Sequence, residues 1–386
     1  MRTGEEHTEE YDERIRQRIM RMREKQNQEK TGQESKQPDK KQKRRKNDEK
    51  STKYKTNSEP KKIEKEPAKE VEKPENHAGK KKKTTEKRKK RRGWKIFVVF
   101  LFILALFAGA VAAGWKALTS TKLEVSFFHL YSEKISSLEG FRAVVLSDLH
   151  NSEFGTDNEE LVEKVRGLSP DVILIAGDMV NKDDPNTEIA VTLCRQLTEI
   201  APVYYGIGNH EGNMIYESGI RIDGELRDVG VTVLINESVD TEINGTPVSV
   251  GSVGTSTLDY DEYSAEFVSE FEQKDEFKIL IAHCPDLYYE KMADVNIDLG
   301  ICGHYHGGQI QLPVLGGLFS YDHGLFPKYC NGMFQLTNST IFVSRGLGNS
   351  HKVPRINNRP EIAVIDVNSR LDGTARTSQT GKETGN

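Results

Sequence analysis

The chain has 386 residues, enough for two domains, but its charge is divided unevenly along its length. Residues 1–92 carry 33 basic and 19 acidic side chains with almost no aromatic or branched apolar residue, whereas the remainder carries 22 basic and 40 acidic ones. The first part therefore cannot bury enough apolar surface to fold and is predicted to be a disordered basic arm, and the acidity of the remainder disfavours nucleic acid as its partner.

An uncharged run of twenty residues, 96–115, predicts a transmembrane helix over residues 94–116. At about 1.5 Å per residue, such a helix crosses a hydrocarbon core of about 30 Å. Trp94 and Trp115 bracket the run, as aromatic residues do at membrane surfaces. A buried core helix is a poor alternative because such helices seldom lack every charge. A cleaved signal peptide is a poor one because a charged leader of 92 residues is too long.

The charges that flank this helix predict its orientation. The sequence KKKKTTEKRKKRRGWK precedes it, whereas only Lys116 and Lys122 follow it closely. Basic residues stay on the cytoplasmic side, so the arm is expected in the cytoplasm and the folded part outside the cell membrane. The basic run 80–92 is interpreted first as this topological signal, second as a contact with anionic lipid and third as a non-specific nucleic-acid binder.

Residues 123–368 alternate short apolar runs with helix-like runs, the pattern of a layered α/β domain. Helical spacing occurs at 158–167 and 186–200, where Asn158 and Asn186 are placed as N-caps. From 308 to 367 the runs are shorter and separated by Gly and Asn, which predicts a second, more antiparallel sheet packed on the first. The tail 369–386 is predicted to be disordered. Before residue 308, the predicted strands are 142–146, 172–176, 203–207, 231–234, 248–251, 278–282 and 299–302.

Five short segments follow predicted strands and present side chains that bind divalent metals. They read SDLH (147–150), GDMVN (177–181), GNHE (208–211), AHCPD (282–286) and GHYHGG (303–308). In an open α/β sheet the loops at the carboxyl ends of strands converge on one edge, so these segments can meet in space. Each segment alone is a weak signal, but five in this order indicate one metal site.

With these motifs the sequence resembles the calcineurin-like metallophosphoesterase superfamily, whose pattern is DxH, GDxxx, GNHE, an isolated His and GHxH. The resemblance covers the outer domain and none of the first 120 residues, and SDLH, GGQ and SRGLGNSHKVPRINNRPEIAVIDV resemble a bacterial membrane-associated or exported branch. Tyr305 departs from the threonine usual in that branch. The resemblance implies a two-sheet αββα sandwich that hydrolyses a phosphomonoester, phosphodiester or pyrophosphate bond, with a hydroxide bridging two cations as the nucleophile.

The resemblance also implies the ligands of the two cations. One would be held by Asp148, His150, Asp178 and His306, and the other by Asp178, Asn209, His283 and His304. Histidine and carboxylate ligands without a thiolate suit manganese, iron or zinc better than magnesium or calcium. His210 would stabilise the phosphate and donate a proton to the leaving group, with a purely ligand-orienting role as the alternative.

Three further polar residues of the late segment are candidate substrate contacts, Arg345, His323 and His351. Arg345 is the best of them because a guanidinium grips phosphate through two hydrogen bonds, although a surface salt bridge is an equally good account. Cys284 and Cys302 adjoin candidate ligands but are interpreted as packing residues, since no CxxC spacing exists.

Two other classes of function compete with the enzyme. One is a non-catalytic, metal-stabilised binding module anchored in the membrane, against which the complete ligand set and His210 argue. The other is a scaffold whose cytoplasmic arm recruits partners. A lipid or cell-envelope component is a candidate substrate, but the metal core is common to enzymes that act on many phosphate esters and does not select one.

Overall fold

The structure is a computed structural model that describes residues 20, 79–135, 140–255, 260–320, 323–349 and 354–369. The chain forms two units, of which one contains residues 20–113 and the other contains the folded domain from Gly114 onward. Most of the predicted basic arm, the predicted tail beyond Ser369 and the candidate His351 lie outside the described residues.

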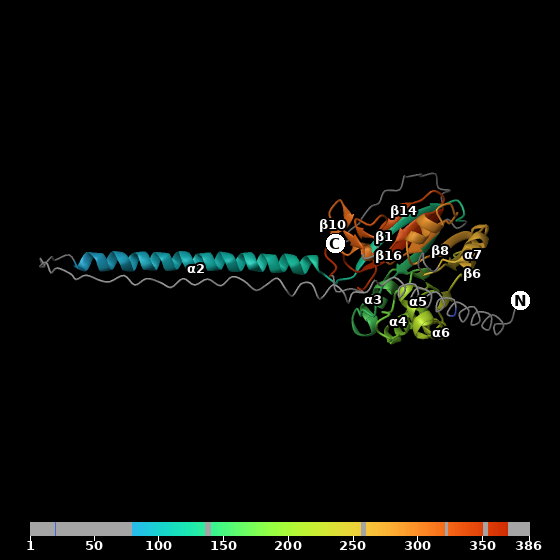
Figure 1. Cartoon of the computed structure of the whole chain (residues 1–386), viewed down its shortest axis with the longest axis horizontal. Coiled ribbons are helices and arrows are strands. Elements are labelled where there is room, and N and C mark those ends of the chain that lie inside the picture. The colour runs from blue at the N-terminus through green and yellow to red at the C-terminus, as the bar shows by residue number, and fades with distance from the viewer. Residues whose placement is uncertain are drawn as a thin grey trace, which may run out of the picture. The chain divides into compact units, whose positions relative to one another are not determined.

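Helix α2 (Gly79–Leu118) contains the predicted membrane-spanning run (Figure 1). Its stretch Phe97–Lys116 has a mean hydropathy of 2.7, which makes it a candidate membrane span by length and composition. α2 begins at Gly79, so residues 79–92 are helical where disorder is predicted. Lys, Arg and Glu favour helices, and a helix already nucleated by the apolar run extends through them with one hydrogen bond per residue.

Two six-stranded mixed sheets form the folded domain. The first sheet contains, in spatial order, β1 (Glu124–Ser132), β16 (Glu361–Ser369), β2 (Phe141–Leu146), β3 (Val172–Ile175), β4 (Val203–Gly206) and β5 (Thr232–Leu234). The second contains β14 (Gly332–Gln335), β15 (Thr340–Val343), β9 (Leu299–Cys302), β8 (Phe277–Ile281), β7 (Thr246–Ser252) and β6 (Glu237–Ile243). Strands β2 to β5 are mutually parallel, as are β7, β8, β9 and β15.

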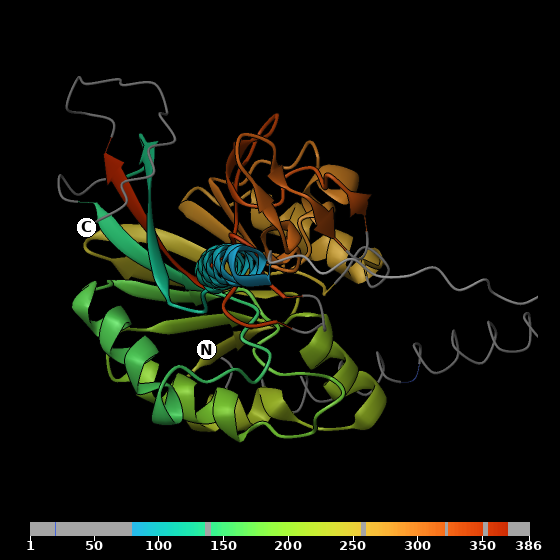
Figure 2. The ribbon, with the colours of Figure 1, turned by 90° about the vertical axis from the view of Figure 1, so that its left-hand side faces the viewer.

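The two sheets pack face to face, with helices on their outer faces (Figure 2). Val145 and Leu174 of the first sheet share a buried core with Val250 and Ile279 of the second. Strand β3 reads VILI and is buried at every position, because a strand covered on both faces needs apolar residues throughout. The architecture is therefore the αββα sandwich.

The outer helices each bury an apolar face against one of the two sheets. Helices α3 (Glu159–Gly167) and α4 (Glu188–Thr198) cover the first sheet together with α6 (Ile222–Asp228). Helix α7 (Glu262–Glu272) packs Val268 and Phe271 on the second sheet. The remaining elements are α5 (Asn209–Asn213), the helical turns η1 (Thr156–Asn158), η2 (Met214–Ser218), η3 (Leu287–Lys291) and η4 (His306–Gly308), and the short strands β10 (Gln311–Leu312), β11 (Gly316–Gly317), β12 (Phe319–Ser320) and β13 (Gly324–Leu325).

The late segment does not form the second large sheet by itself, contrary to the prediction, and its own sheets are only the two-stranded pairs β10–β11 and β12–β13. β14 and β15 form an antiparallel pair that joins β9 at the edge of the second sheet, and β16 returns to the first sheet between β1 and β2. The centre of the second sheet comes instead from β7, β8 and β9. An apolar run identifies a strand but not its sheet, because the partner is chosen by the connections.

Two edge strands, β1 and β6, are absent from the predicted strands. Both are half-exposed, so their apolar signal is weak. The cap prediction also needs correction at Asn158. This residue directly precedes α3, but its side chain accepts a hydrogen bond from the Phe154 amide at 2.9 Å and makes none to the first turn of the helix.

Candidate metal centre

The predicted ligands all follow the carboxyl ends of parallel strands. They are Asp148 and His150 after β2, Asp178 after β3, Asn209 after β4, His283 after β8, and His304 and His306 after β9. Two glycines that precede ligands are required by close packing. A Cβ on Gly208 would lie 2.2 Å from a carboxylate oxygen of Asp178, and one on Gly303 would lie 2.5 Å from a carboxylate oxygen of Asp148.

Four side chains converge as the first ligand group, which we define as Asp148, His150, Asp178 and His306. The Nε2 atoms of His150 and His306 are 3.2 Å apart. Asp148 Oδ1 lies 4.0 Å from the first of these nitrogens and 3.7 Å from the second, and Asp178 Oδ2 lies 3.9 Å from His150 Nε2. Ligands at about 2.0–2.2 Å from one cation lie roughly 3–3.6 Å apart, so this group is close to the size of a metal site.

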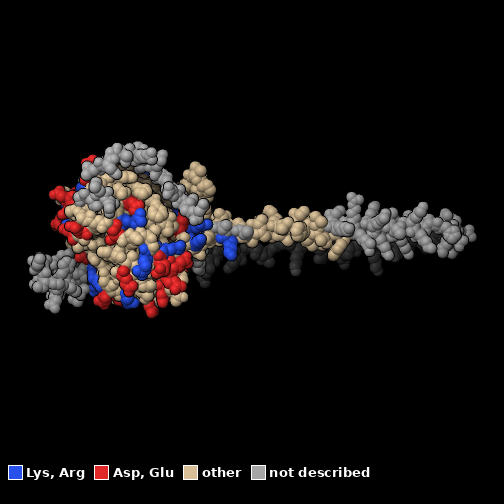
Figure 3. Space-filling view, turned by 180° about the vertical axis from the view of Figure 1, so that it is seen from behind, with Lys and Arg blue, Asp and Glu red and all other residues tan. Residues whose placement is uncertain are grey.

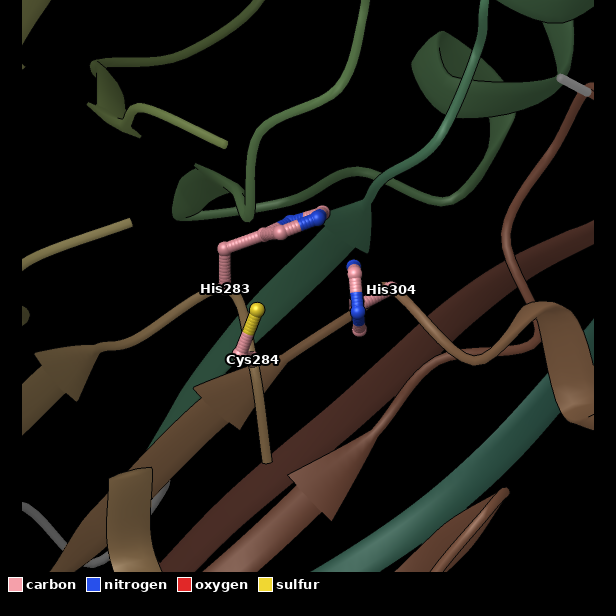
Figure 4. Close-up of side chains that lie close together, drawn as sticks. All are labelled: His283, Cys284 and His304. Carbon is pink, nitrogen blue, oxygen red and sulfur yellow. The ribbon is translucent and has the colours of Figure 1, made fainter. Parts of the chain in front are cut away.

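The second ligand group comprises Asp178, Asn209, His283 and His304. Figure 4 shows the rings of His283 and His304 turned toward one another from the ends of β8 and β9, with centroids 5.1 Å apart. His283 Nε2 lies 3.0 Å from Asp178 Oδ2. Asp178 Oδ2 thus faces both groups, the position that a bridging carboxylate takes between two cations.

Buried atoms without partners test whether this centre fits metal ions. His283 Nε2 has no hydrogen-bond partner despite its proximity to Asp178, because the two atoms are not aligned for a hydrogen bond. Asn209 Oδ1 is likewise buried and unpartnered. Nδ1 of His283 points to the Ala176 carbonyl, which holds a proton there, so that Nε2 carries the lone pair whenever the ring is neutral. These groups fit a cation, which would satisfy both atoms.

The protonation states of the candidate ligands also suit metal binding. Burial lowers the pKa of His150 to about 3 and that of His306 well below its ordinary value, so both rings are neutral lone-pair donors at pH 7. Burial alone would raise the pKa of Asp178, but His283, His210 and His150 outweigh it and hold the pKa well below the usual range. The Asp178 carboxylate in turn outweighs the burial of His283 and raises its pKa to about 10. A bound cation would displace that proton.

His210 lies beside the two groups and is held by the loop after β3. The Lys182 amide donates to its Nδ1 at 2.9 Å, so the proton of the neutral ring is on Nε2. Nε2 lies 3.9 Å from Asp178 Oδ2. The backbone amide of His210 also donates to Asp178 Oδ1 at 2.8 Å. His210 therefore presents an N–H group toward the centre, as a phosphate contact or proton donor requires.

Glu211, which ends the GNHE motif, organises the centre, although no role is predicted for it from the sequence. Its Oε1 accepts from the Met179 amide at 2.7 Å and from the Tyr205 hydroxyl at 2.8 Å. Its Oε2 accepts from the amides of Asp178 and Gly208, each at 2.8 Å. The wholly buried carboxylate thereby ties the loop after β3 to the loop after β4.

Arg355 is a second residue of the centre whose role is not predicted from the sequence. Its guanidinium donates to the carbonyls of Gly348 and Arg345, and Nη2 lies 3.2 Å from Nδ1 of His306. It is 9 % exposed and fixes the position of the His306 ring. Burial lowers the pKa of Arg355 to about 10, so it still carries its charge at pH 7.

The candidate substrate contacts have different surroundings. The Arg345 guanidinium pairs with Glu361 at 2.8 Å, as the salt-bridge alternative predicts, but the pair is buried and not on the surface. His323 is partly exposed, and its Nε2 lies 2.8 Å from Asp286 Oδ2. The other oxygen of Asp286 accepts from the Tyr305 hydroxyl, so His323 is connected to the loop that carries His304 and His306. His351 is not among the described residues.

Cys284 is closer to the centre than the sequence indicates. Its ligand atom lies within 4.8 Å of those of His283 and His304. The thiol donates a hydrogen bond to the Thr255 carbonyl at 3.1 Å, which is consistent with the predicted packing role. Figure 4 shows its sulfur beside the two imidazoles.

A two-sheet sandwich that gathers histidines and carboxylates at the carboxyl ends of its strands is typical of metal-dependent hydrolases. The sequence profile described as "Calcineurin-like phosphoesterase" matches residues 141–308, a range that includes every predicted ligand. The chain belongs to this family and is a metallophosphoesterase, a hydrolase of phosphoric ester bonds.

Three relatives illustrate the match. The uncharacterized metallophosphoesterase YkuE of Bacillus subtilis is 29% identical over 69% of this chain and 94% of its own length. Phosphodiesterase YaeI of Escherichia coli is 31% identical over 59% of this chain and 82% of its own length. A "transmembrane protein with metallophosphoesterase domain" of Bos taurus is 28% identical over 59% of this chain and 53% of its own length.

Proposed function

We propose that this chain is a membrane-anchored dimetal phosphodiesterase, with the first and second ligand groups each holding one divalent cation. The observation that carries the proposal is the position of Asp178. Its Oδ2 lies 3.0 Å from His283 Nε2 and 3.9 Å from His150 Nε2, so one carboxylate oxygen is within reach of both groups. Manganese, iron and zinc suit this mixture of nitrogen and oxygen ligands.

The side chains divide the chemistry among them. When bound, two cations would offset negative charge on the phosphoryl oxygens and would lower the pKa of a coordinated water from about 15.7 toward about 7. Asn209 contributes a neutral oxygen, which keeps the centre more positive than a further carboxylate would. His210 directs its Nε2 proton toward the centre, where it can bind a phosphoryl oxygen or protonate the leaving oxygen.

A phosphodiester is the substrate class we favour, because the Escherichia coli relative named a phosphodiesterase is 31% identical over 82% of its own length. A phosphomonoester and a pyrophosphate are the competing substrates. A diester in a lipid or another cell-envelope component suits an enzyme anchored in a membrane.

Activity of the full-length protein tests this proposal. With manganese in detergent, the wild type should hydrolyse bis(p-nitrophenyl) phosphate faster than p-nitrophenyl phosphate. Asp178→Asn should lower kcat/KM by about 10³-fold or more, because it weakens the carboxylate shared by both ligand groups. Asp294→Asn, at an exposed position, is the matched control and should keep wild-type activity. Equal activity of Asp178→Asn and the control would refute the proposed centre.

The proposed topology places the N-terminus in the cytoplasm and the folded domain outside. Its support is the basic run before Phe97–Lys116 and the scarcity of charges just after it. Added protease should digest a C-terminal tag on intact cells. Protection of the tag until the membrane is opened would reverse the orientation.

A further inference from the structure

An apolar turn, residues 313–315, projects from the folded domain between β10 and β11. Val314 has a relative exposure of 106% and Leu315 is 67% exposed. Val314 also has a left-handed backbone (φ 70°), which strains a β-branched residue and which Gly or Asn adopts readily. Side chains this exposed gain nothing from the described part of the domain. The apolar turn is therefore suited to an apolar environment outside it.

The apolar turn forms part of the wall of a pocket with a volume of about 460 Å³. Two arginines also line this pocket. Arg345 is paired with Glu361 and lies 3.5 Å from Glu124, so its charge is compensated. Arg359 is exposed and makes no hydrogen bond or ion pair that involves the described residues. An uncompensated guanidinium beside apolar side chains suits a molecule with an anionic headgroup and an apolar body.

The pocket lies at the end of the candidate membrane span. Leu118, the last residue of α2, lines the pocket, and its carbonyl accepts from the Asn357 amide at 2.6 Å. The span ends at Lys116, so Leu118 lies about 3 Å further along the helix. The headgroup layer is about 5–7 Å thick on each side of a bilayer. Chain connectivity therefore keeps Leu118, one of the residues that line the pocket, at headgroup depth, and Figure 3 shows basic side chains where the chain enters the folded domain.

The pocket and the metal-ligand loop share a wall. Gln311 lines the pocket and donates its side-chain amide to the Gly307 carbonyl. Asn358, next to the pocket-lining Asn357, donates to the His306 carbonyl at 2.7 Å. A molecule in the pocket would thus contact the segments that position the ligand His306.

We propose that the pocket and the apolar turn form a bilayer-docking surface, in which Arg359 binds the headgroup of an anionic phospholipid while Val314 and Leu315 enter the membrane interface. The inference rests on the proposed membrane anchor and does not depend on catalysis. Such docking would hold the metal centre at a fixed height above the bilayer, within reach of esters in lipid headgroups.

A fluorescent probe at the apolar turn tests the inference. Full-length, EDTA-treated Val314→Cys is labelled with a polarity-sensitive dye and reconstituted into phosphatidylcholine vesicles with or without roughly 30% phosphatidylglycerol. The native cysteines are buried, so the label reports on position 314. Tyr131→Cys is the matched control, because Tyr131 is 46% exposed and lies seven residues along β1 from the pocket residue Glu124, about 23 Å away.

Spin-labelled lipids should quench the probe at 314 about threefold more than the probe at 131, and more strongly in anionic vesicles. Arg359→Gln should reduce the quenching in anionic vesicles to the level in phosphatidylcholine. Equal quenching at 314 and 131 would overturn the docking surface. Indifference to anionic lipid, or a response to soluble glycerol phosphate in place of vesicles, would overturn the lipid-headgroup assignment. Because the readout needs neither metal nor turnover, its failure is distinct from failure of the phosphodiesterase.

Discussion

Several candidate ligands hold backbone conformations that cost free energy. Asp148, Asp178, His304 and His306 all have left-handed φ angles, between 48° and 71°. Each such residue costs roughly 1–3 kcal/mol and persists only where its surroundings determine it, as at ligand-binding loops. At Asp178 those surroundings include Glu211, which accepts a hydrogen bond from its amide. The strain is therefore consistent with a preformed centre.

The position of His210 predicts a leaving-group effect. His210→Ala should lower kcat by about 10²–10³-fold for a diester with an alkoxide leaving group, because the variant has no Nε2 proton to donate to the leaving oxygen. The loss should be much smaller for nitrophenyl esters, since nitrophenolate leaves without a proton. Steady-state kinetics on both esters, with metal content measured as the control, check this. An equal loss on both would contradict proton donation by His210 and leave it as a phosphate contact or a ligand-orienting residue.

The shifted pKa values predict how the stability of the metal-free protein depends on pH. His150 and His306 have lowered pKa values, so they stabilise the fold above about pH 6.5 and this contribution is lost as the pH falls. His283 has its pKa raised to about 10, so its contribution is complete below about pH 6.5 and is lost as the pH rises toward 10. The Tm of the EDTA-treated protein should thus be highest near pH 6.5.

Thermal unfolding between pH 5 and pH 9 measures this dependence. His283→Gln is the informative variant, because it should remove the alkaline decline and keep the acid one. A Tm that climbs steadily from pH 6.5 to 9 in the metal-free wild type would contradict the assignment of His283.

Motif order alone was enough to predict which distant residues meet. The segments that carry Asp148, Asp178 and His283 follow separate strands, and the structure brings these side chains within metal-binding distance of one another. Sequence could not give roles to Glu211 and Arg355. Their contribution is made through buried hydrogen bonds to backbone groups, which depend on loop geometry rather than residue type. The ligand roles themselves stay predictions until a metal is located.

At the scale of elements, a buried ion pair joins the two sheets. Arg345 follows β15 of the second sheet, and Glu361 begins β16 of the first. The arginine Nη2 also donates to the Ser126 hydroxyl on β1 at 3.1 Å. Both members of the pair are less than 5% exposed, so neither charge can be solvated if the other is removed.

Replacing Arg345 should destabilise the domain. Arg345→Met leaves Glu361 buried without a cation and should lower the free energy of unfolding by about 3–5 kcal/mol. The double variant Arg345→Met/Glu361→Met should recover part of the loss, because no buried charge remains. Denaturant unfolding of the three proteins checks this. Wild-type stability in the single variant would contradict a stabilising role for the buried pair.

Some strands could be predicted from the sequence more closely than others. The buried parallel strands are continuous apolar runs, so β2, β3, β4, β8 and β9 could be predicted to within about a residue. The partner of β16 could not, because its insertion between β1 and β2 depends on chain connections across the whole domain. The edge strand β1 alternates half-buried and exposed residues and lacked a clear apolar run.

At the scale of the whole molecule, charge and hydropathy divide the chain into three parts. The candidate span Phe97–Lys116 separates a basic N-terminal part from an acidic folded domain that carries the candidate metal centre. This division could be predicted because composition is a local property of the chain. The substrate could not, since the same metal ligands serve many phosphate esters and selection depends on the surfaces around them.

Metal content tests the central claim most directly. Elemental mass spectrometry of the purified full-length protein, loaded with manganese and freed of excess ion, should find two cations per chain in the wild type, since Asp178 faces two ligand groups. Asp178→Asn should retain at most one, because the shared carboxylate is lost. A wild type that binds a single cation, or an Asp178→Asn variant that keeps two, would contradict the dimetal centre.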